Sequence, residues 1–141
     1  MRTKTIGLIA HTEKAGVAKL ARDVISEFTK RSLKVIVENE TAKIAKQKTS
    51  GSIAQIAQHS DLIVVLGGDG TILNVVTMAG KNLKPIFGIN VGSLGFLTTV
   101  NSSAYREVVD AIVSGRITYS KRALLSVEFA RIDACFQVSM P

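Results

Sequence analysis

Residues 62–71 read Leu-Ile-Val-Val-Leu-Gly-Gly-Asp-Gly-Thr, an apolar run that breaks abruptly into three glycines around one carboxylate. A five-residue apolar run rich in Val and Ile is typical of a central parallel strand. The glycines let the backbone turn sharply and approach a ligand closely, because they carry no Cβ. Thr71 is expected to cap a following helix, which brings backbone N–H groups and the positive end of a helix dipole together. This stretch therefore predicts a phosphate-binding turn after a buried strand.

Asp69 is the unusual residue of this turn. An acid beside an anion site is electrostatically unfavourable unless it accepts a proton or faces a cation, so its presence suggests phosphoryl transfer. The turn lacks the Gly-Lys-Ser/Thr ending of a common phosphate-binding loop. It also lacks the usual dinucleotide fingerprint with its acidic ribose ligand, which argues against a conventional dehydrogenase.

The segments around this stretch alternate between strand and helix patterns. Strands are predicted at 6–10, 33–37, 62–66 and 85–89, and helices at 15–31, 71–79 and 104–113. Residues 41–58 are expected to form a mobile surface region, in which helix-like segments are interrupted by Thr49-Ser50-Gly51-Ser52. The alternation predicts an α/β, Rossmann-like fold with an open, mainly parallel sheet and helices on both faces.

The last part of the chain has a different pattern. Residues 124–129 and 133–138 alternate like two antiparallel strands. We expect these to be the first strands of an incomplete β-rich domain. The predicted domains are thus an α/β catalytic and nucleotide-binding domain at residues 1–118 and the start of a truncated C-terminal domain at 119–141.

Composition narrows the class of protein. The 141 residues carry 18 basic and 11 acidic side chains, a net charge of +7, but the basic residues are dispersed and not interleaved with aromatics. This pattern favours solvated helix faces, so no nucleic-acid partner is predicted. No apolar stretch approaches the about 20 residues of a membrane span, so no membrane association is predicted. Cys135 is the single cysteine, and a reducing, cytoplasmic location fits best.

A second glycine-rich loop follows the fourth predicted strand. Residues 88–98 read Gly-Ile-Asn-Val-Gly-Ser-Leu-Gly-Phe-Leu-Thr. In an open parallel sheet, loops at the carboxyl ends of strands line the ligand crevice. One glycine turn is weak evidence, because many turns need glycine for structural reasons. Two such loops, one of them holding an acid, predict a ligand site.

These two loops resemble a known family. Residues 67–71 resemble the signature of the superfamily that contains NAD kinases, diacylglycerol and sphingosine kinases, and 6-phosphofructokinases. Residues 88–98 are similar to the NAD kinase segment in particular, and the two motifs stand in that family's order over nearly all of the chain. The second loop has Val91 and Ser93 where many members carry a basic residue, and Thr99 where an acid is common.

The resemblance implies an activity. An NAD kinase transfers a phosphoryl group from ATP or polyphosphate to the 2′-hydroxyl of the adenosine ribose of NAD, which gives NADP. By resemblance Asp69 is the general base that takes the hydroxyl proton. Mg²⁺ or another divalent cation is expected to offset the triphosphate charge. No metal-ligating side chain is assigned.

The resemblance also implies substrate-binding residues. The phosphate cradle is expected to be shaped by Gly67, Gly68, Gly70 and Thr71. In the same way, Phe96 is expected to pack against the adenine of NAD, with Leu73 as a further apolar wall. Asn90 completes the set of candidate binding residues.

Each candidate has a structural alternative. Asp69 could be a turn acid that bonds its own backbone, and Phe96 could be an ordinary core residue. Asn90 could bond the loop backbone instead of a ligand. His11, which follows the first strand at the same edge of the sheet, could contact nucleotide phosphates or be a polar loop residue.

The family's segments for the NAD ribose and nicotinamide lie further along the chain than residue 141. The resemblance therefore implies that this chain is an inactive or weak fragment of an enzyme that binds NAD and ATP and forms a homo-oligomer, a dimer or tetramer. Two alternatives stay open. One is a lipid kinase of the same superfamily, and the other is a non-catalytic nucleotide-binding module.

Overall fold

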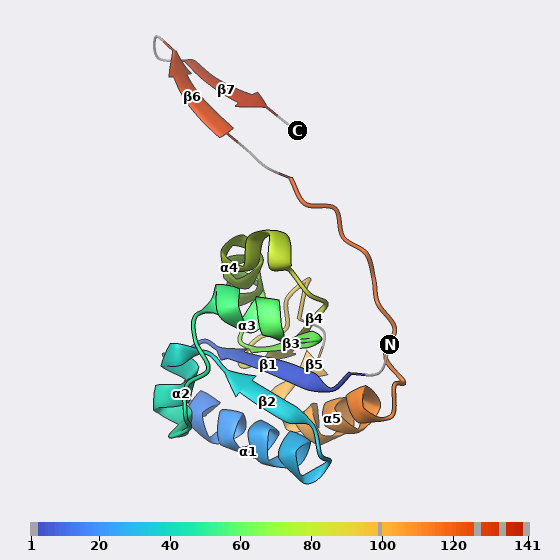
Figure 1. Cartoon of the computed structure of the whole chain (residues 1–141). Helices are drawn as coiled ribbons and strands as arrows, with labels where there is room; N and C mark the ends of the chain where they lie inside the picture. Colours follow the sequence, from blue (N-terminus) through green and yellow to red (C-terminus); the bar gives the residue numbers. More distant parts are fainter. Residues whose placement is uncertain (1–2, 99, 126–127, 133–134, 140–141) are drawn as a thin grey trace.

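A parallel five-stranded sheet forms the centre of the protein. The computed structural model describes residues 3–98, 100–125, 128–132 and 135–139. The sheet has the order β2-β1-β3-β4-β5, and every neighbouring pair is parallel (Figure 1). Its strands are β1 (Thr5–Ala10), β2 (Lys34–Val37), β3 (Leu62–Leu66), β4 (Ile86–Asn90) and β5 (Val100–Asn101).

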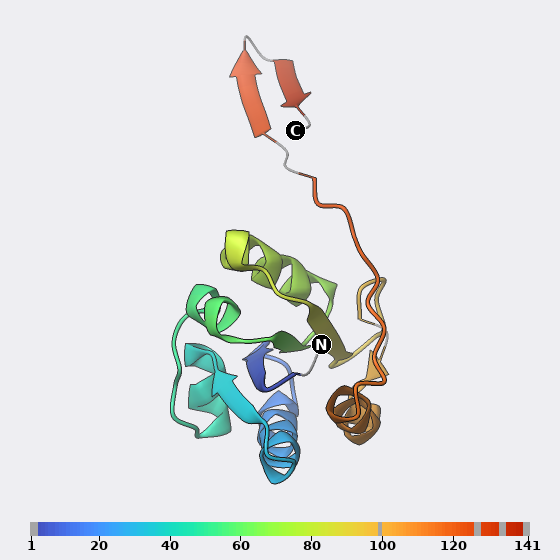
Figure 2. The same ribbon diagram turned by 45° about the vertical axis from the view of Figure 1, so that its right-hand side comes forward.

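Helices cover both faces of the sheet, so the predicted α/β fold is confirmed. The helices α1, α2 and α5 lie on one side and α3 and α4 on the other (Figures 1 and 2). They are α1 (Val17–Lys30), α2 (Asn39–Ala45), α3 (Ile53–His59), α4 (Asp69–Ala79) and α5 (Tyr105–Val113), with short 3-10 turns η1 (Gly80–Asn82) and η2 (Ser102–Ala104).

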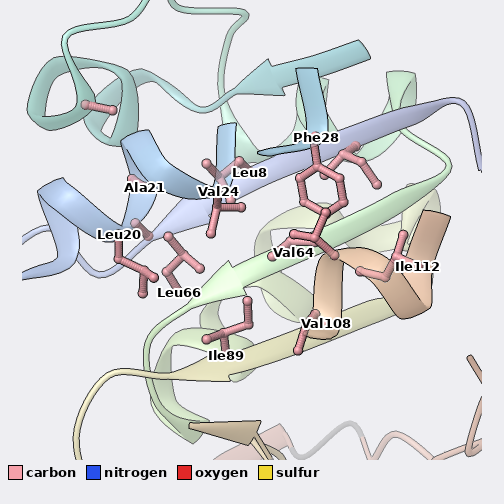
Figure 3. Close-up of a cluster of buried hydrophobic side chains, with 14 of the residues drawn as sticks. Leu8, Leu20, Ala21, Val24, Phe28, Val64, Leu66, Ile89, Val108 and Ile112 are labelled. Atoms are coloured by element: carbon pink, nitrogen blue, oxygen red, sulfur yellow. The ribbon is translucent and has the colours of Figure 1, made fainter. Parts of the chain in front are cut away.

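The core is aliphatic and has one layer on each face of the sheet. All five residues of β3 are buried, as expected for a central strand with helices on both sides. On one side, Phe28 of α1 is completely buried next to residues of β3 and α5 (Figure 3). The side chains of α3 and α4 build the other layer on the opposite face. These layers hold the carboxyl ends of the strands in fixed positions.

Residues 41–58 pack more tightly than their sequence predicts. The expectation of a mobile surface region is wrong for the helical parts, because Thr41 and Ile56 are completely buried. Ser52 begins α3 with a capping box, in which its hydroxyl accepts from the N–H of Gln55 and the Gln55 side chain accepts from the N–H of Ser52. The interrupting segment thus marks a helix start.

The end of the chain forms an antiparallel pair of strands, β6 (Glu128–Ile132) and β7 (Cys135–Ser139). The antiparallel pairing agrees with the prediction, but the first strand begins four residues later than expected. Leu124 and Leu125 therefore precede it and are exposed. Residues 126–127 and 133–134 of the predicted strands lie outside the described residues. Within the described chain, no helix has the length and apolar character needed to cross a membrane.

Candidate functional site

The first glycine loop leads directly from β3 into α4. Gly68 is the N-cap in an extended conformation, and no side chain caps the helix. The prediction that Thr71 is the cap is wrong, because the helix begins at Asp69 and Thr71 lies within its first turn. The Thr71 side chain instead packs over Gly67, where a Cβ would come within 2.5 Å of the Thr71 hydroxyl oxygen. Gly67 is therefore required by this internal contact.

Gly68 and Gly70 have a different environment from Gly67. A Cβ built at either position would meet no atom within 4 Å. The first backbone N–H groups of a helix have no acceptor within the helix, and here no side chain supplies one. The Thr71 N–H donates to the Gly68 carbonyl at 3.1 Å, so the start of α4 offers an anionic ligand the N–H groups of Asp69 and Gly70, next to open space.

The carboxylate of Asp69 is held by the second glycine loop. Its Oδ2 accepts a hydrogen bond from the Phe96 N–H at 2.8 Å, and its Oδ1 accepts from the N–H groups of Leu97 at 3.0 Å and Thr98 at 3.2 Å. These bonds, that from Phe96 foremost, lower the pKa of Asp69 below its ordinary value of 3.8, against the opposing effect of desolvation. Asp69 thus bonds the backbone of the neighbouring loop instead of its own turn.

Two buried polar residues, Asn90 and Thr98, form a hydrogen-bond chain that ends on the Asp69 carboxylate. The Asn90 side-chain amide donates to the Thr98 hydroxyl at 2.6 Å, and that hydroxyl in turn donates to Asp69 Oδ1 at 3.4 Å. Asn90 is only 2% exposed, so in this structure its partner is Thr98. Gly95 lies so close to Asp69 that a Cβ there would be 2.5 Å from the carboxyl carbon.

Sequence reasoning missed Thr98 and Gly95 as members of the site. The available signal was that both belong to the loop 88–98, which was already singled out as a ligand loop. Nothing in the spacing revealed that the loop's N–H groups turn toward Asp69.

Apolar side chains stand exposed beside the carboxylate. Phe96 is 93% exposed, which excludes its interpretation as a core residue, and Leu73 on α4 is 57% exposed. Leu94 of the same loop is equally exposed. A flat apolar group placed here would gain contact area without any rearrangement of the core.

A cleft of about 620 Å³ lies next to the first glycine loop, and Asp69 is not among the residues that line it. It is bounded by the ends of β1 and β2 and by the start of α4. The lining residues are Ile9, Ala10, His11, Thr12, Glu13, Lys14, Glu38, Glu40, Ile53, Gly68, Gly70, Thr71 and Asn74.

Six of the eight predicted site residues fall into two groups, while Gly67 packs against the Thr71 side chain and Leu73 is exposed on α4. Gly68, Gly70 and Thr71 line the cleft. The second group surrounds the carboxylate on the side of β4 and comprises Asp69, Asn90 and Phe96. The first turn of α4 belongs to both and joins them.

His11 lies in the wall of the cleft, as the phosphate-contact interpretation requires. Its Nδ1 is buried and has no hydrogen-bond partner among the described residues. No group of three or more His, Cys, Asp or Glu side chains in the described part of the chain is arranged to hold a metal ion.

Comparison with known proteins identifies the family. Residues 6–117 match the family model described as the ATP-NAD kinase N-terminal domain. The chain is 36% identical over 128 residues to an NAD kinase of Desulforamulus reducens, covering 90% of this chain and 44% of that protein. It is 34% identical over 130 residues to an NAD kinase of Nitrosospira multiformis, covering 91% of this chain and 44% of that protein.

A solved structure has the same fold. The crystal structure of yeast NADH kinase complexed with NADH superposes with a TM-score of 0.77 at 21% sequence identity, covering 99% of this chain and 47% of that one. The chain thus spans less than half the length of the relatives that it matches. The family model, the relatives and the two glycine loops agree, and the chain belongs to the NAD kinase family.

Proposed function

We propose that this chain is the phosphate-binding and base-carrying part of an NAD kinase, which transfers the terminal phosphoryl group of ATP to the adenosine ribose 2′-hydroxyl of NAD. The observation that carries the proposal is the position of Asp69. It lies in the first turn of α4, whose glycines Gly68 and Gly70 line the cleft. Its carboxylate accepts a hydrogen bond from the N–H of Phe96, whose side chain is exposed. Membership of the NAD kinase family selects this reaction over phosphorylation of a lipid.

The two sides of the first turn of α4 suit the two substrates. The phosphate chain of the donor would lie in the cleft against the N–H groups around Gly68 and Gly70. The adenine of NAD would rest on Phe96 and Leu73, which are exposed on the side of the carboxylate. Acceptor and donor would then meet at Asp69, and holding them together supplies much of the rate enhancement.

Asp69 Oδ2 is the atom best placed to act as the base. It accepts one hydrogen bond, from Phe96, whereas Oδ1 accepts from Leu97 and Thr98. A carboxylate oxygen has two acceptor positions, so Oδ2 keeps one for the ribose hydroxyl. In the proposed step the 2′-oxygen bonds the γ-phosphorus as its proton passes to Oδ2, the bond from the γ-phosphorus to the β,γ-bridging oxygen breaks, and ADP leaves.

A divalent cation would enter as part of the donor, bound to its phosphates. Within the described residues, no group of three or more His, Cys, Asp or Glu side chains is arranged to hold a metal ion. Polyphosphate is the other donor that the family resemblance allows. We further propose a cytoplasmic homo-oligomer. We also expect the 141 residues alone to turn over weakly, because they match less than half of each relative.

The test is formation of NADP from ATP, Mg²⁺ and NAD. It is run on this chain and on a longer form that carries the C-terminal half present in the relatives. Asp69→Asn should lower turnover in the longer form by about 10²- to 10⁴-fold, because the amide accepts no proton at neutral pH. Binding of ATP should change little, since Asp69 is not among the residues that line the cleft.

A matched control is Asp110→Asn, which removes an exposed carboxylate on α5 that pairs with Arg31 and belongs to neither glycine loop nor the cleft. It should leave NADP formation unchanged. Equal activity of Asp69→Asn and the unaltered protein would contradict the role of Asp69. Nucleotide binding without any NADP formation in the longer form would favour the non-catalytic module.

A further inference from the structure

The cleft beside α4 lies at the point where the strand order changes direction. From β1 the chain moves to β2 at one edge and then returns to β3 on the opposite side of β1. In open parallel sheets this topological switch point is where ligands bind, outside the carboxyl ends of the strands. Residues 9–14, at the end of β1 and just after it, line the cleft, and β1 lies between β2 and β3 in the sheet.

The two ends of the cleft have opposite chemistry. At one end lie Gly68, Gly70 and Thr71 at the start of α4, where backbone donors suit phosphate. On the β2 side of β1 lie Glu38 and Glu40, and Ile53, the first residue of α3, also lines the cleft. A ligand that is anionic along its whole length would place one end against these acids. A ligand with a phosphate chain at one end and hydroxyl groups at the other would fit both.

Glu38 is held rigidly at the carboxyl end of β2. Its carboxylate caps α2: Oε1 accepts from the Glu40 N–H at 3.0 Å, and Oε2 accepts from the Thr41 N–H and hydroxyl at 3.0 and 2.9 Å. The Thr41 hydroxyl also accepts from the N–H of Ala10, which ties the cap to the end of β1. Because Oε1 has only one protein partner, it keeps an acceptor position for a ligand donor.

Glu40 adds a second, more mobile acceptor at the rim. Its side chain is 61% exposed and pairs with Lys43 at 2.6 Å. The charged lining residues of the cleft comprise three glutamates, Glu13, Glu38 and Glu40, and one lysine, Lys14. Lys43 offsets the charge of Glu40. Among the described residues, Lys14 is the only lysine or arginine that lines the cleft beside Glu13 and Glu38, so a uniformly negative ligand would be disfavoured next to Glu38.

We propose that Glu38 and Glu40 accept hydrogen bonds from the ribose hydroxyls of the phosphoryl donor while Ile53 contacts its base, so that the cleft selects a nucleoside triphosphate over an inorganic polyphosphate. This inference rests on the proposed function and decides between the two donors that the family resemblance leaves open. The volume of about 620 Å³ is within the usual range for small-ligand sites.

The experiment is calorimetric titration of the chain with three magnesium-loaded probes: ATP, 2′,3′-dideoxy-ATP and inorganic tripolyphosphate. ATP should bind about tenfold more tightly than the dideoxy nucleotide, because only ATP donates hydroxyl hydrogen bonds to carboxylates. Tripolyphosphate should bind more weakly than ATP as well. Absence of ATP binding at millimolar concentration would overturn the proposal.

The variants Glu38→Gln and Glu40→Gln test whether these two carboxylates cause the preference for ATP over dideoxy-ATP. Each should reduce the preference for ATP over dideoxy-ATP, and together they should bring the ratio of dissociation constants close to one. Both should strengthen tripolyphosphate binding by about two- to fivefold, since they remove negative charge from the wall. Because Glu38 caps α2, the melting temperature of Glu38→Gln shows whether it still folds. Glu40→Gln, which is not the capping residue, keeps the test valid if Glu38→Gln is unstable.

Glu107→Gln is the matched control, since Glu107 is an exposed glutamate on α5 outside the cleft. It should leave all three affinities unchanged. A ratio of ATP to dideoxy-ATP affinity that stays the same in both glutamine variants would overturn the inference even if NADP formation is observed. Conversely, a ratio that falls as expected while no NADP forms in the longer protein would retain this donor site and reject the kinase activity.

Discussion

The two glycine loops of this protein use the same residue type for opposite purposes. In the first loop, Gly68 and Gly70 border empty space, and the backbone donors at the start of α4 remain available. In the second loop, Gly95 lies in close contact with Asp69. The N–H groups of the three residues that follow Gly95 donate hydrogen bonds to the Asp69 carboxylate. The first loop is thus open to a ligand, whereas the second holds a side chain of the protein. Glycine content alone does not distinguish the two.

Gly95→Ala should have the largest effect on stability. The added Cβ overlaps the Asp69 carboxylate, so the carboxylate must move and give up its hydrogen bonds to the loop. We expect a loss of about 1–3 kcal/mol in the free energy of unfolding, as for other overpacked sites. Urea unfolding of the variant and the unaltered chain measures it, and an unchanged midpoint would show that the loop moves freely.

Thr98→Val should have the next largest effect. Valine keeps the shape of threonine but removes the hydroxyl that accepts from Asn90 and donates to Asp69. The Asn90 amide would remain buried without this partner, which costs about 1–2 kcal/mol. Ser102→Ala, a change in a residue of η2 outside the site, is the control for loss of a hydroxyl. Equal unfolding energies for the two variants would rule out a special role for the Thr98 hydroxyl.

Gly70→Ala should change stability in the opposite direction to the two variants of the second loop, because it should stabilise the protein. Gly70 lies inside α4 with free space around it, and alanine favours a helix over glycine by about 0.5–1 kcal/mol. The variant should therefore unfold at higher urea concentration. Because Gly70 lines the cleft, its new methyl group should weaken ATP binding in the same sample. A loss of both stability and binding would mean that the first loop also packs against the chain.

The sequence predicts the sheet well because the strand signal is local. Residues 62–66 are apolar throughout and become a strand buried on both faces, and the two glycine loops lie at the ends of β3 and β4 as expected. Residues 41–58 were less predictable, because their helices are short and depend on tertiary contacts such as the burial of Ile56.

The site was predicted as a set of residues, but its geometry was not. Asp69 and Phe96 are 27 residues apart, and no periodic pattern connects a carboxylate to the N–H groups of a distant loop. Glu38 was missed entirely, because its position in the cleft depends on β2 lying beside β1. Such relations follow from strand order, which the local pattern of a segment does not contain.

Acidification should affect the two loops differently, and this is the smallest of the expected effects. The hydrogen bonds from Phe96, Leu97 and Thr98 lower the pKa of Asp69 below 3.8. For a carboxyl group with a lowered pKa, the stabilising contribution is complete above its ordinary value and is lost as the pH falls through the lower, folded value. The backbone amide signals of the second loop should therefore shift in NMR spectra with a midpoint below 3.8, while those of Gly68 and Gly70 should shift only as covalent neighbours of Asp69.

Asp69→Asn provides the control for this titration, because it has no proton to gain. In that variant the amide shifts of residues 96–98 should be flat over the same pH range. Asp61 must be followed separately, since the N–H groups of Lys4 and Thr5 also lower its pKa. Its carboxylate bonds the start of β1, at the other end of the strands from both loops. A midpoint at or above 3.8 in the second loop would mean that its N–H groups do not hold the carboxylate in solution, and the contrast between the two loops would then disappear.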